Sequence, residues 1–331
     1  MNMKLHSVFE QHKGKASDKW SLYLDVYNHE FSRFIDKDPS ILEIGVQNGG
    51  SLEIWDDFLS PKKIVGCDIN PKCNELEYSN SNIKLLVQDI NLDSSLLFVK
   101  EELPDGIDLL IDDGSHTSSD IITTFSKYFP LLNDGGLFVV EDLHCSYWNE
   151  FEGGLYDPYS SMSFLKTLAD LVNYEHWGVS KKTRVDLLND FAKKYQISFD
   201  ESTLSGIHSV RFYNSICIVE KNKYASNELG QRRVTGESQA VISLEHVGSS
   251  AVAYNQDNNK WSILKSSPES QYESMQEQIQ ELQKQVQEFQ EQTQNLDGKI
   301  VDIENHNSQL QQEISLFRSS LLGKLYKLIY K

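Results

Sequence analysis

Long apolar runs and metal-binding cysteine patterns are both missing from this sequence. No run of about 18 apolar residues occurs in the 331-residue chain, so we expect no transmembrane helix. The first residues also lack the apolar core of a signal peptide. The four cysteines have no metal-ligand spacing. These absences predict a cytoplasmic protein with reduced thiols.

Positive charge is scarce as well. Lys and Arg total 31 against 49 Asp and Glu, a formal net charge of −18. Because a phosphate-binding surface needs clustered Lys and Arg, this balance excludes nucleic acid as a partner. Apolar and aromatic residues thin out after residue 222. We therefore predict a globular domain over 1–222, a polar linker over 223–268, a coiled coil over 269–317 and a basic tail over 318–331.

Short β-rich runs alternate with amphipathic segments between residues 20 and 222, which predicts a mainly parallel α/β sheet of the Rossmann-like class. The strand candidates are ILEIGV, KIVGCDI, IKLLVQDI, IDLLIDDG and GGLFVVEDL. Ile207–Tyr213 and Ser215–Lys221 predict a C-terminal antiparallel hairpin, which a dehydrogenase-type sheet does not need. Within the linker, 234–247 and 249–255 are candidates for small strands.

A heptad repeat begins at Tyr272. Apolar spacings of three and four persist for about seven heptads, with mainly Gln and Glu between them. β-branched residues dominate one core set and Leu is the commonest residue in the other, which favours a parallel dimer, with a trimer left open; Asn307 could fix the register. The alternative is a long helix folded back on the globular domain, although such a helix should show a wider apolar stripe.

The last residues predict a basic amphipathic helix. Leu321, Leu322, Leu325, Leu328 and Ile329 share one helical face, and Lys324, Lys327 and Lys331 occupy an opposing sector. This pattern is typical of a helix lying peripherally on an anionic membrane, here the inner face of the cell membrane. The alternative is that the tail only completes the coiled coil.

A glycine turn follows the first strand candidate. Glu43, Gly45 and Gly49 form E-x-G-x-x-x-G before a helical stretch, where tight turns and free helix amides can meet a ligand. A strand, a glycine turn and a helix would fit NAD, FAD or S-adenosylmethionine. The dinucleotide pattern GxGxxG is absent, which favours S-adenosylmethionine. The alternative is a purely structural turn.

Acids follow the next two strand candidates. Asp68 stands where a carboxylate can accept hydrogen bonds from both ribose hydroxyls. Gln88 and Asp89 stand where an adenine amino group could be bound. Both acids could instead serve only as caps of local turns.

Acids and histidines cluster after the fourth and fifth strand candidates, at Asp112, Asp113, His116, Glu141, Asp142 and His144. Adjacent parallel strands bring these ends to one rim, where four carboxylates would repel one another and raise their own pKa values. A divalent cation resolves this, and oxygen ligands favour Mg²⁺. The alternative is a set of solvated strand-end acids.

The segments ILEIGVQNGGS, IDLLIDDGSH and LFVVEDLHCSYW resemble metal-dependent sugar O-methyltransferases that act on macrolides such as mycinamicin, and cephalosporin hydroxylase-like proteins. The resemblance covers about residues 10–222. It implies that Asp113, Glu141 and Asp142 hold Mg²⁺ and that His116 is the general base. Cys145 stands where relatives often have Thr. The segment 13–19 resembles a pocket-covering segment to which we assign no roles. Asp112 joins the expected cofactor set.

The sequence therefore predicts methyl transfer from S-adenosylmethionine to a sugar hydroxyl, with a bacterial surface polysaccharide of the O-antigen type as the first expectation for the acceptor. His144, Tyr147 and Trp148 are candidates for acceptor contacts, although the two aromatic residues could equally serve helix packing. Tailoring of an antibiotic or another small glycoside is an alternative. A further alternative is a non-catalytic scaffold whose coiled coil is the working part.

Overall fold

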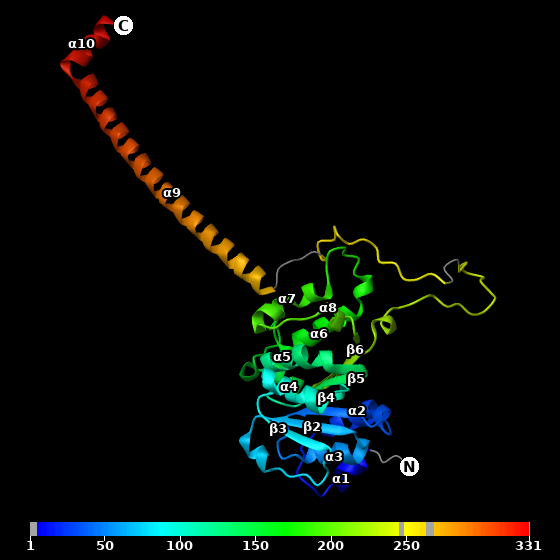
Figure 1. The fold of residues 1–331 in the computed structure, drawn as a ribbon. Helices are drawn as coiled ribbons and strands as arrows, with labels where there is room; N and C mark the ends of the chain where they lie inside the picture. Colours follow the sequence, from blue (N-terminus) through cyan, green and yellow to red (C-terminus); the bar gives the residue numbers. More distant parts are fainter. Residues whose placement is uncertain (1–4, 245–247, 263–267, 331) are drawn as a thin grey trace. The chain divides into compact units, whose positions relative to one another are not determined.

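A seven-stranded mixed sheet organises the N-terminal part of the protein, whose computed structural model describes residues 5–244, 248–262 and 268–330. The strand order is β3-β2-β1-β4-β5-β7-β6. Figure 1 labels β2 to β6 of this sheet. The strands are β1 Ser40–Ile44, β2 Lys63–Asp68, β3 Ile83–Val87, β4 Ile107–Asp112, β5 Leu132–Val140, β6 Ile207–Tyr213 and β7 Ile216–Lys221. β1 to β5 pair in parallel and β7 is antiparallel to both neighbours. The predicted Rossmann-like sheet and its hairpin are confirmed.

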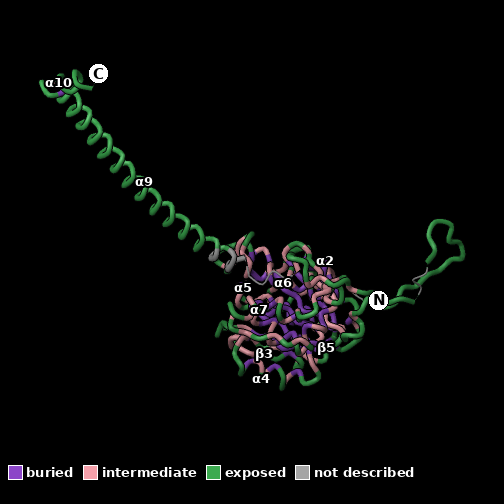
Figure 2. Tube along the Cα trace, turned by 90° about the horizontal axis from the view of Figure 1, so that it is seen from above, coloured by how far each residue is buried: buried purple, intermediate pink, exposed green. Residues whose placement is uncertain are grey.

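Helices cover both faces of the sheet, so each face has its own apolar core. The helices of this part are α1 Leu5–Gln11, α2 Ser21–Phe31, α3 Gly50–Leu59, α4 Asp93–Glu102, α5 Ser118–Tyr128, α6 Ser161–Val172, α7 Arg184–Tyr195 and α8 Glu201–Leu204. Residues of α1, α2 and α3 pack on one face, and residues of α4 to α8 pack on the other. The buried core is visible in purple in Figure 2.

Burial explains why the strands read as continuous apolar runs. Every residue of β1 is buried, and four residues of β4 are buried in succession, because both strands lie inside a sheet covered on both faces. β4 lies between β1 and β5, so the polar residues that follow these strands meet at one edge. This adjacency positions the candidate site.

An ion-pair cluster anchors the hairpin to α2. Arg211 of β6 donates to both carboxylate oxygens of Glu30 and to Glu220 of β7. Arg33 donates to the other oxygen of Glu220, and Tyr213 donates to Glu30. Both glutamates are buried. The hairpin is thereby fixed to the helix that begins next to the site.

The linker differs from the prediction of small strands. Among its described residues only one isolated bridge forms, between Gln231 and Ser250; positions 245–247 of the first predicted strand lie outside the described residues. Leu229 donates its amide to Glu175, and the amide of Gln256 donates to Gly178. Leu229 and Gln256, on either side of this bridge, are thus tied to one short stretch of the domain.

The C-terminal part is helical. Residues 1–265 and 266–331 form two compact units. The second holds α9, Pro268–Ser319, and α10, Leu321–Ile329. Ser320 separates them, and its side chain accepts the Gly323 amide to cap α10. The long helix is confirmed, whereas its pairing stays a prediction. No helix among the described residues is long and apolar enough to cross a membrane. Lys331 of the predicted tail lies outside the described residues.

Candidate active site

The turn between β1 and α3 approaches the end of β4 closely. Gly45 has φ +88°, and a Cβ added there would lie 1.9 Å from the backbone oxygen of Asp113. Gly49 has φ +83° and precedes the first residue of α3. An added Cβ at Gly49 would lie 2.2 Å from the Tyr78 hydroxyl. The two glycines are therefore required by backbone conformation and by space.

Asp68, the last residue of β2, holds this turn. Its Oδ2 accepts the amides of Val46 and Gln47 at 2.9 and 2.8 Å, and its Oδ1 accepts the amide of Asn70 at 2.8 Å. Asp68 therefore does cap a local turn, which was the alternative considered from the sequence. Each carboxylate oxygen has two lone pairs, so Oδ1 keeps capacity for a further donor. Asp68 also lines both cavities of the cleft.

The first cavity of the cleft, about 220 Å³, lies beyond the ends of β1, β2, β3 and β4. Asp68, Gln88, Asp89 and Asp112 line it. Asp89 accepts the amide of Asn91, as a turn cap would, and Gln88 donates to Ser94. Asp112 is 5% exposed, and its Oδ2 has no hydrogen-bond partner among the described residues. Burial raises the pKa of Asp112 to about 7. This acceptor is suited to a ligand that brings a donor.

The second cavity, about 360 Å³, continues the first. Both are lined by Gly45, Asp68 and Gly114. Further residues of the second cavity are Lys19, Asp113, His116 and Asp142. The two cavities thus form one cleft that runs from the ends of β2 and β3 to the acids after β4 and β5.

His116 and Asp142 face each other across this second cavity. His116 Nε2 lies 3.7 Å from Asp142 Oδ2. Both residues have left-handed backbone conformations, with φ +59° and +53°. Such conformations in non-glycine residues are costly and gather at functional sites. Two of them at one point therefore support a functional role.

A cation would fit between the same residues. Ligand atoms of Asp113, His116 and Asp142 all lie within 4.8 Å of one another, and each residue is partly exposed to the cavity. Two carboxylates and an imidazole are an acceptable donor set for a divalent ion, and the carboxylates suit Mg²⁺. The residues present therefore fit a metal ion.

Glu141 lies beside this group with other partners. Its Oε1 accepts from Lys19 at 2.8 Å and from the Tyr27 hydroxyl at 2.6 Å. Lys19 also donates to Asp113 at 2.5 Å and lies 3.9 Å from Glu43. Burial opposes the charge of Lys19, but the three acids outweigh it, so the pKa of Lys19 is raised. Lys19 is thus the internal counter-ion of the acidic cluster.

Glu43 lies within β1 rather than on the cavity wall. It is fully buried, and its Oε2 accepts the Trp55 indole at 2.9 Å. Its Oε1 has no hydrogen-bond partner among the described residues. Burial raises the pKa of Glu43 to about 7, although Lys19 opposes that rise.

Aromatic rings lie next to the metal-ligand candidates. The Trp20 ring stands edge-on to His144, with centroids 6.2 Å apart, and His144 stands edge-on to Trp148 at 5.1 Å. Phe151 is tilted against both Trp148 and His116. We call Trp20, His144, Trp148 and Phe151 the aromatic wall. Trp20 and Trp148 are at least half exposed, and Tyr147 is 42% exposed. The wall therefore offers ring surface beside the acids.

Sequence reasoning assigned no roles to the residues that reach the acids from the N-terminal segment. Lys19, Trp20, Tyr23 and Tyr27 donate hydrogen bonds to Asp113, Glu141 or Asp142. Their spacing places the three aromatic residues on one side of α2 and its first turn, which is the only signal the sequence contains.

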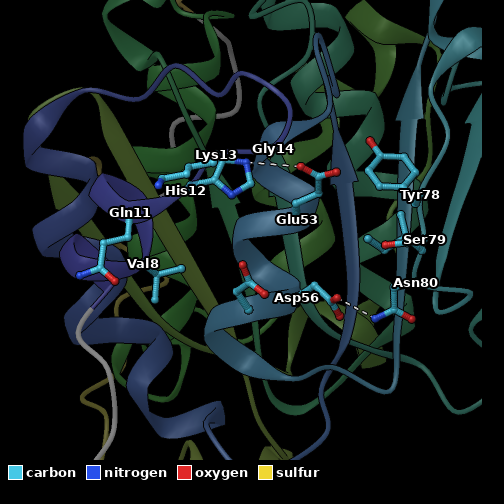
Figure 3. Close-up of a pocket in the computed structure, with 12 residues that line it drawn as sticks. Val8, Gln11, His12, Lys13, Gly14, Glu53, Asp56, Tyr78, Ser79 and Asn80 are labelled. Carbon is cyan, nitrogen blue, oxygen red and sulfur yellow. Dashed lines mark hydrogen bonds and ion pairs between the residues drawn. The ribbon is translucent and has the colours of Figure 1, made fainter.

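A separate cavity of about 500 Å³ lies where the N-terminal segment meets α3 (Figure 3). It shares no lining residue with the cleft. Its polar groups pair with each other: His12 lies 3.3 Å from Glu53, and Asn80 donates to Asp56. Lys15 also pairs with Glu53, and the Ala16 oxygen accepts the Gly50 amide. These contacts fix the segment that ends at Lys19.

Sequence comparison finds relatives among sugar O-methyltransferases, while no family model matches the chain. The chain is 37% identical over 172 residues to the 8-demethyl-8-α-L-rhamnosyl tetracenomycin-C 2′-O-methyltransferase of Streptomyces olivaceus, covering 49% of this chain and 44% of the relative. It is 33% identical over 160 residues to the mycinamicin VI 2″-O-methyltransferase of Micromonospora griseorubida, covering 45% and 39%. The chain thus spans less than half of these two relatives.

Structure comparison finds the same fold in a solved enzyme of this kind. The MycE methyltransferase of mycinamycin biosynthesis, in complex with Mg and SAH, matches with a TM-score of 0.55 and 24% identity, covering 68% of this chain and 56% of that one. The N-terminal domain is thus similar in sequence to sugar O-methyltransferases and shares its fold with the MycE methyltransferase.

Proposed function

We propose that the protein transfers a methyl group from S-adenosylmethionine to a hydroxyl of a sugar-containing acceptor, with Mg²⁺ as the metal. The observation that carries this proposal is the continuity of the cleft. A nucleoside-sized cavity ending in Asp112 joins a second cavity that holds His116 between the carboxylates of Asp113 and Asp142.

In the proposed complex, Asp68 accepts from the ribose, while Gln88, Asp89 and Asp112 offer acceptors to the adenine end. The methionine end then reaches toward the second cavity past Gly45. Holding both substrates in one cleft aligns the acceptor oxygen, the methyl carbon and the sulfur, which lowers the entropic part of the barrier.

His116 is the proposed base. It takes the proton of the acceptor hydroxyl as the oxygen forms a bond to the methyl carbon, and the carbon–sulfur bond breaks to leave S-adenosylhomocysteine. Asp113 and Asp142, with Glu141 as the third expected carboxylate, would hold the Mg²⁺, which when bound supplies Lewis-acid polarisation of the acceptor hydroxyl. Since the Glu141 oxygen Oε1 already accepts from Lys19 and Tyr27, its part in metal binding is the least supported.

A small glycoside is the better supported acceptor. The names of the relatives identify a rhamnosyl tetracenomycin and mycinamicin VI as their substrates, whereas the surface polysaccharide expected from the sequence has no support among them. The aromatic wall suits the apolar face of a sugar ring, and its exposed indoles lie beside the acids.

The test is calorimetric titration of the full chain with S-adenosylmethionine, with and without Mg²⁺, followed by methyl-transfer assays on a rhamnoside and on an O-antigen polysaccharide. We expect cofactor binding, and turnover of the rhamnoside that stops in EDTA and returns with Mg²⁺. If turnover persists after EDTA treatment and exhaustive dialysis, the proposal that the reaction requires Mg²⁺ is contradicted. Absence of cofactor binding under both conditions favours the non-catalytic scaffold.

We also propose that α9 pairs with α9 of another copy of the chain, with a parallel dimer favoured over a trimer. The apolar heptad residues of the described helix are exposed: Leu282, Phe289, Leu296 and Ile303 are each 58–66% exposed. A lone helix that presents such a stripe to water is unstable, and pairing buries it. Light scattering on the full chain and on a chain lacking 269–331 tests this, and a monomeric full-length protein would refute the pairing.

The α10 helix is proposed to bind an anionic membrane surface. Leu321, Leu322 and Leu328 are more than 70% exposed, and Lys324 and Lys327 lie in the opposing sector. Deleting 320–331 should keep the oligomer and reduce flotation with anionic liposomes, most clearly at low salt. Equal flotation of both proteins would rule out a membrane role for α10 and leave the enzymatic proposal intact.

A further inference from the structure

Among the described residues, side-chain hydrogen bonds reach only Oδ1 of the Asp142 carboxylate. Its Oδ1 accepts the Trp20 indole N–H at 3.0 Å and the Tyr23 hydroxyl at 2.8 Å. Its Oδ2 faces the cavity, 3.7 Å from His116 Nε2. Oδ1 is therefore held by the two donors, whereas Oδ2 is directed at the candidate metal position.

Tyr23 also holds the backbone of Asp142. The amide of Asp142 donates to the Tyr23 hydroxyl at 3.0 Å, and the residue is in the left-handed region with φ +53°. The same hydroxyl lies 3.0 Å from both the backbone oxygen and Oγ of Ser215, in the turn of the β6–β7 hairpin. One buried phenol thus stabilises a costly conformation and the orientation of the side chain it carries.

Trp20 links the same carboxylate to the aromatic wall. Its ring is 61% exposed, and it stands edge-on to His144 at 6.2 Å. An exposed indole gains little from burial, so its fixed position depends on the hydrogen bond to Asp142. A change at the metal-binding carboxylate would therefore move a ring of the wall, and a sugar against the wall would affect the carboxylate.

We propose that Trp20 and Tyr23 are positioning residues for metal binding: they saturate Asp142 Oδ1, so that Oδ2 alone is presented to the cation, and Trp20 couples the cation to the acceptor side of the cleft. This inference rests on the proposed function, because it requires a metal at Asp142. Outer partners of metal ligands commonly change metal affinity when they are removed.

The experiment is calorimetric titration of Mg²⁺ into full-length wild-type protein and into Trp20→Phe, Tyr23→Phe and Trp148→Phe. Trp20→Phe and Tyr23→Phe should each weaken Mg²⁺ binding by about 10- to 100-fold. Trp148→Phe is the matched control, since Trp148 contacts His144 in the same wall and has no described contact with Asp142; its Mg²⁺ affinity should stay within about twofold of wild type. Affinity for S-adenosylmethionine should not change in any of them.

Tryptophan fluorescence supplies a second readout. Mg²⁺ should change the emission of wild type and of Trp148→Phe, and the change should be lost in Trp20→Phe. Tyr23 is buried, so its phenylalanine variant can lose stability; Trp20 is mostly exposed, and Trp20→Phe should unfold within a few degrees of wild type. This variant keeps the test decisive even when Tyr23→Phe folds poorly.

The outcomes separate the two proposals. Wild-type protein that binds Mg²⁺ with an affinity unchanged in Trp20→Phe overturns the positioning role and leaves the proposed function standing. Equal weakening in Trp20→Phe and Trp148→Phe also overturns it, because the effect would then belong to the wall as a whole. Wild-type protein that binds no Mg²⁺ overturns both.

Discussion

Replacing Asp68 by Asn tests whether this residue binds the ribose or only holds the glycine turn. The carboxylate accepts three backbone amides, two at Oδ2 and one at Oδ1. An asparagine oxygen in the Oδ2 position keeps the amides of Val46 and Gln47, while its amino group replaces the acceptor that faces Asn70. The variant should therefore fold, and lose the charge and the free acceptor capacity.

The expected loss follows from the bonds removed. A hydrogen bond to a charged group contributes about 1.5–3 kcal/mol. Its loss should therefore raise the dissociation constant for S-adenosylmethionine roughly 10- to 150-fold. Loosening of the turn could produce a similar loss without any ribose contact. Loss of a ribose contact should depend on the 2′-hydroxyl of the ligand, whereas loosening of the turn should not.

Calorimetry with S-adenosylhomocysteine and its 2′-deoxy analogue separates them. If Asp68 accepts from the ribose, wild type should bind the deoxy analogue about tenfold more weakly, and Asp68→Asn should bind both ligands equally. Asp89→Asn is the control, since Asp89 follows the neighbouring strand and should keep the wild-type ratio. If Asp68→Asn keeps the wild-type ratio of the two dissociation constants, the ribose assignment is refuted and Asp68 serves only to hold the turn.

Three further substitutions test other parts of the structure. His116→Ala should keep cofactor affinity and lose about 10²–10⁴-fold in turnover; an active variant would place the base elsewhere. Gly45→Ala, whose Cβ would overlap a carbonyl oxygen at the end of β4, should destabilise the fold by about 1–3 kcal/mol in urea unfolding, and a neutral effect would contradict the close approach. Arg211→Ala leaves Glu30 and Glu220 short of a buried partner and should cost about 3 kcal/mol, whereas a loss below about 0.5 kcal/mol would show that solvent screens these pairs.

The sheet and the rim of the cleft could be predicted because their signals are local. Each strand is an apolar run that ends in a glycine turn or an acid, and β4 and β5 are neighbours, so Asp113 and Asp142 had to meet at one edge. The antiparallel hairpin could be predicted in the same way, from the two β-rich segments on either side of Asn214. The direction of each side chain could not be predicted. Glu43 belongs to the glycine-turn motif, yet it is buried inside β1 and does not line the second cavity.

The contacts of the N-terminal segment could not be predicted. Trp20 and Tyr23 meet Asp142 across 122 and 119 residues of sequence, and nothing in the spacing of an indole and a phenol names a carboxylate so far along the chain. The boundary between the coiled coil and the basic tail is a local signal by contrast: the sequence predicts it between residues 317 and 318, and the helices divide at Ser320, whose side chain caps α10.

The left-handed backbone at His116 sets the stability of the fold against the proposed reaction. Glycine adopts such a conformation without the steric cost borne by a side chain, so His116→Gly relieves about 1 kcal/mol or more of strain. The exchange also removes the imidazole from the cleft, and with it the proposed base. Selection for thermal stability alone would therefore tend to recover variants altered at His116, and a stabilised enzyme must gain its stability elsewhere.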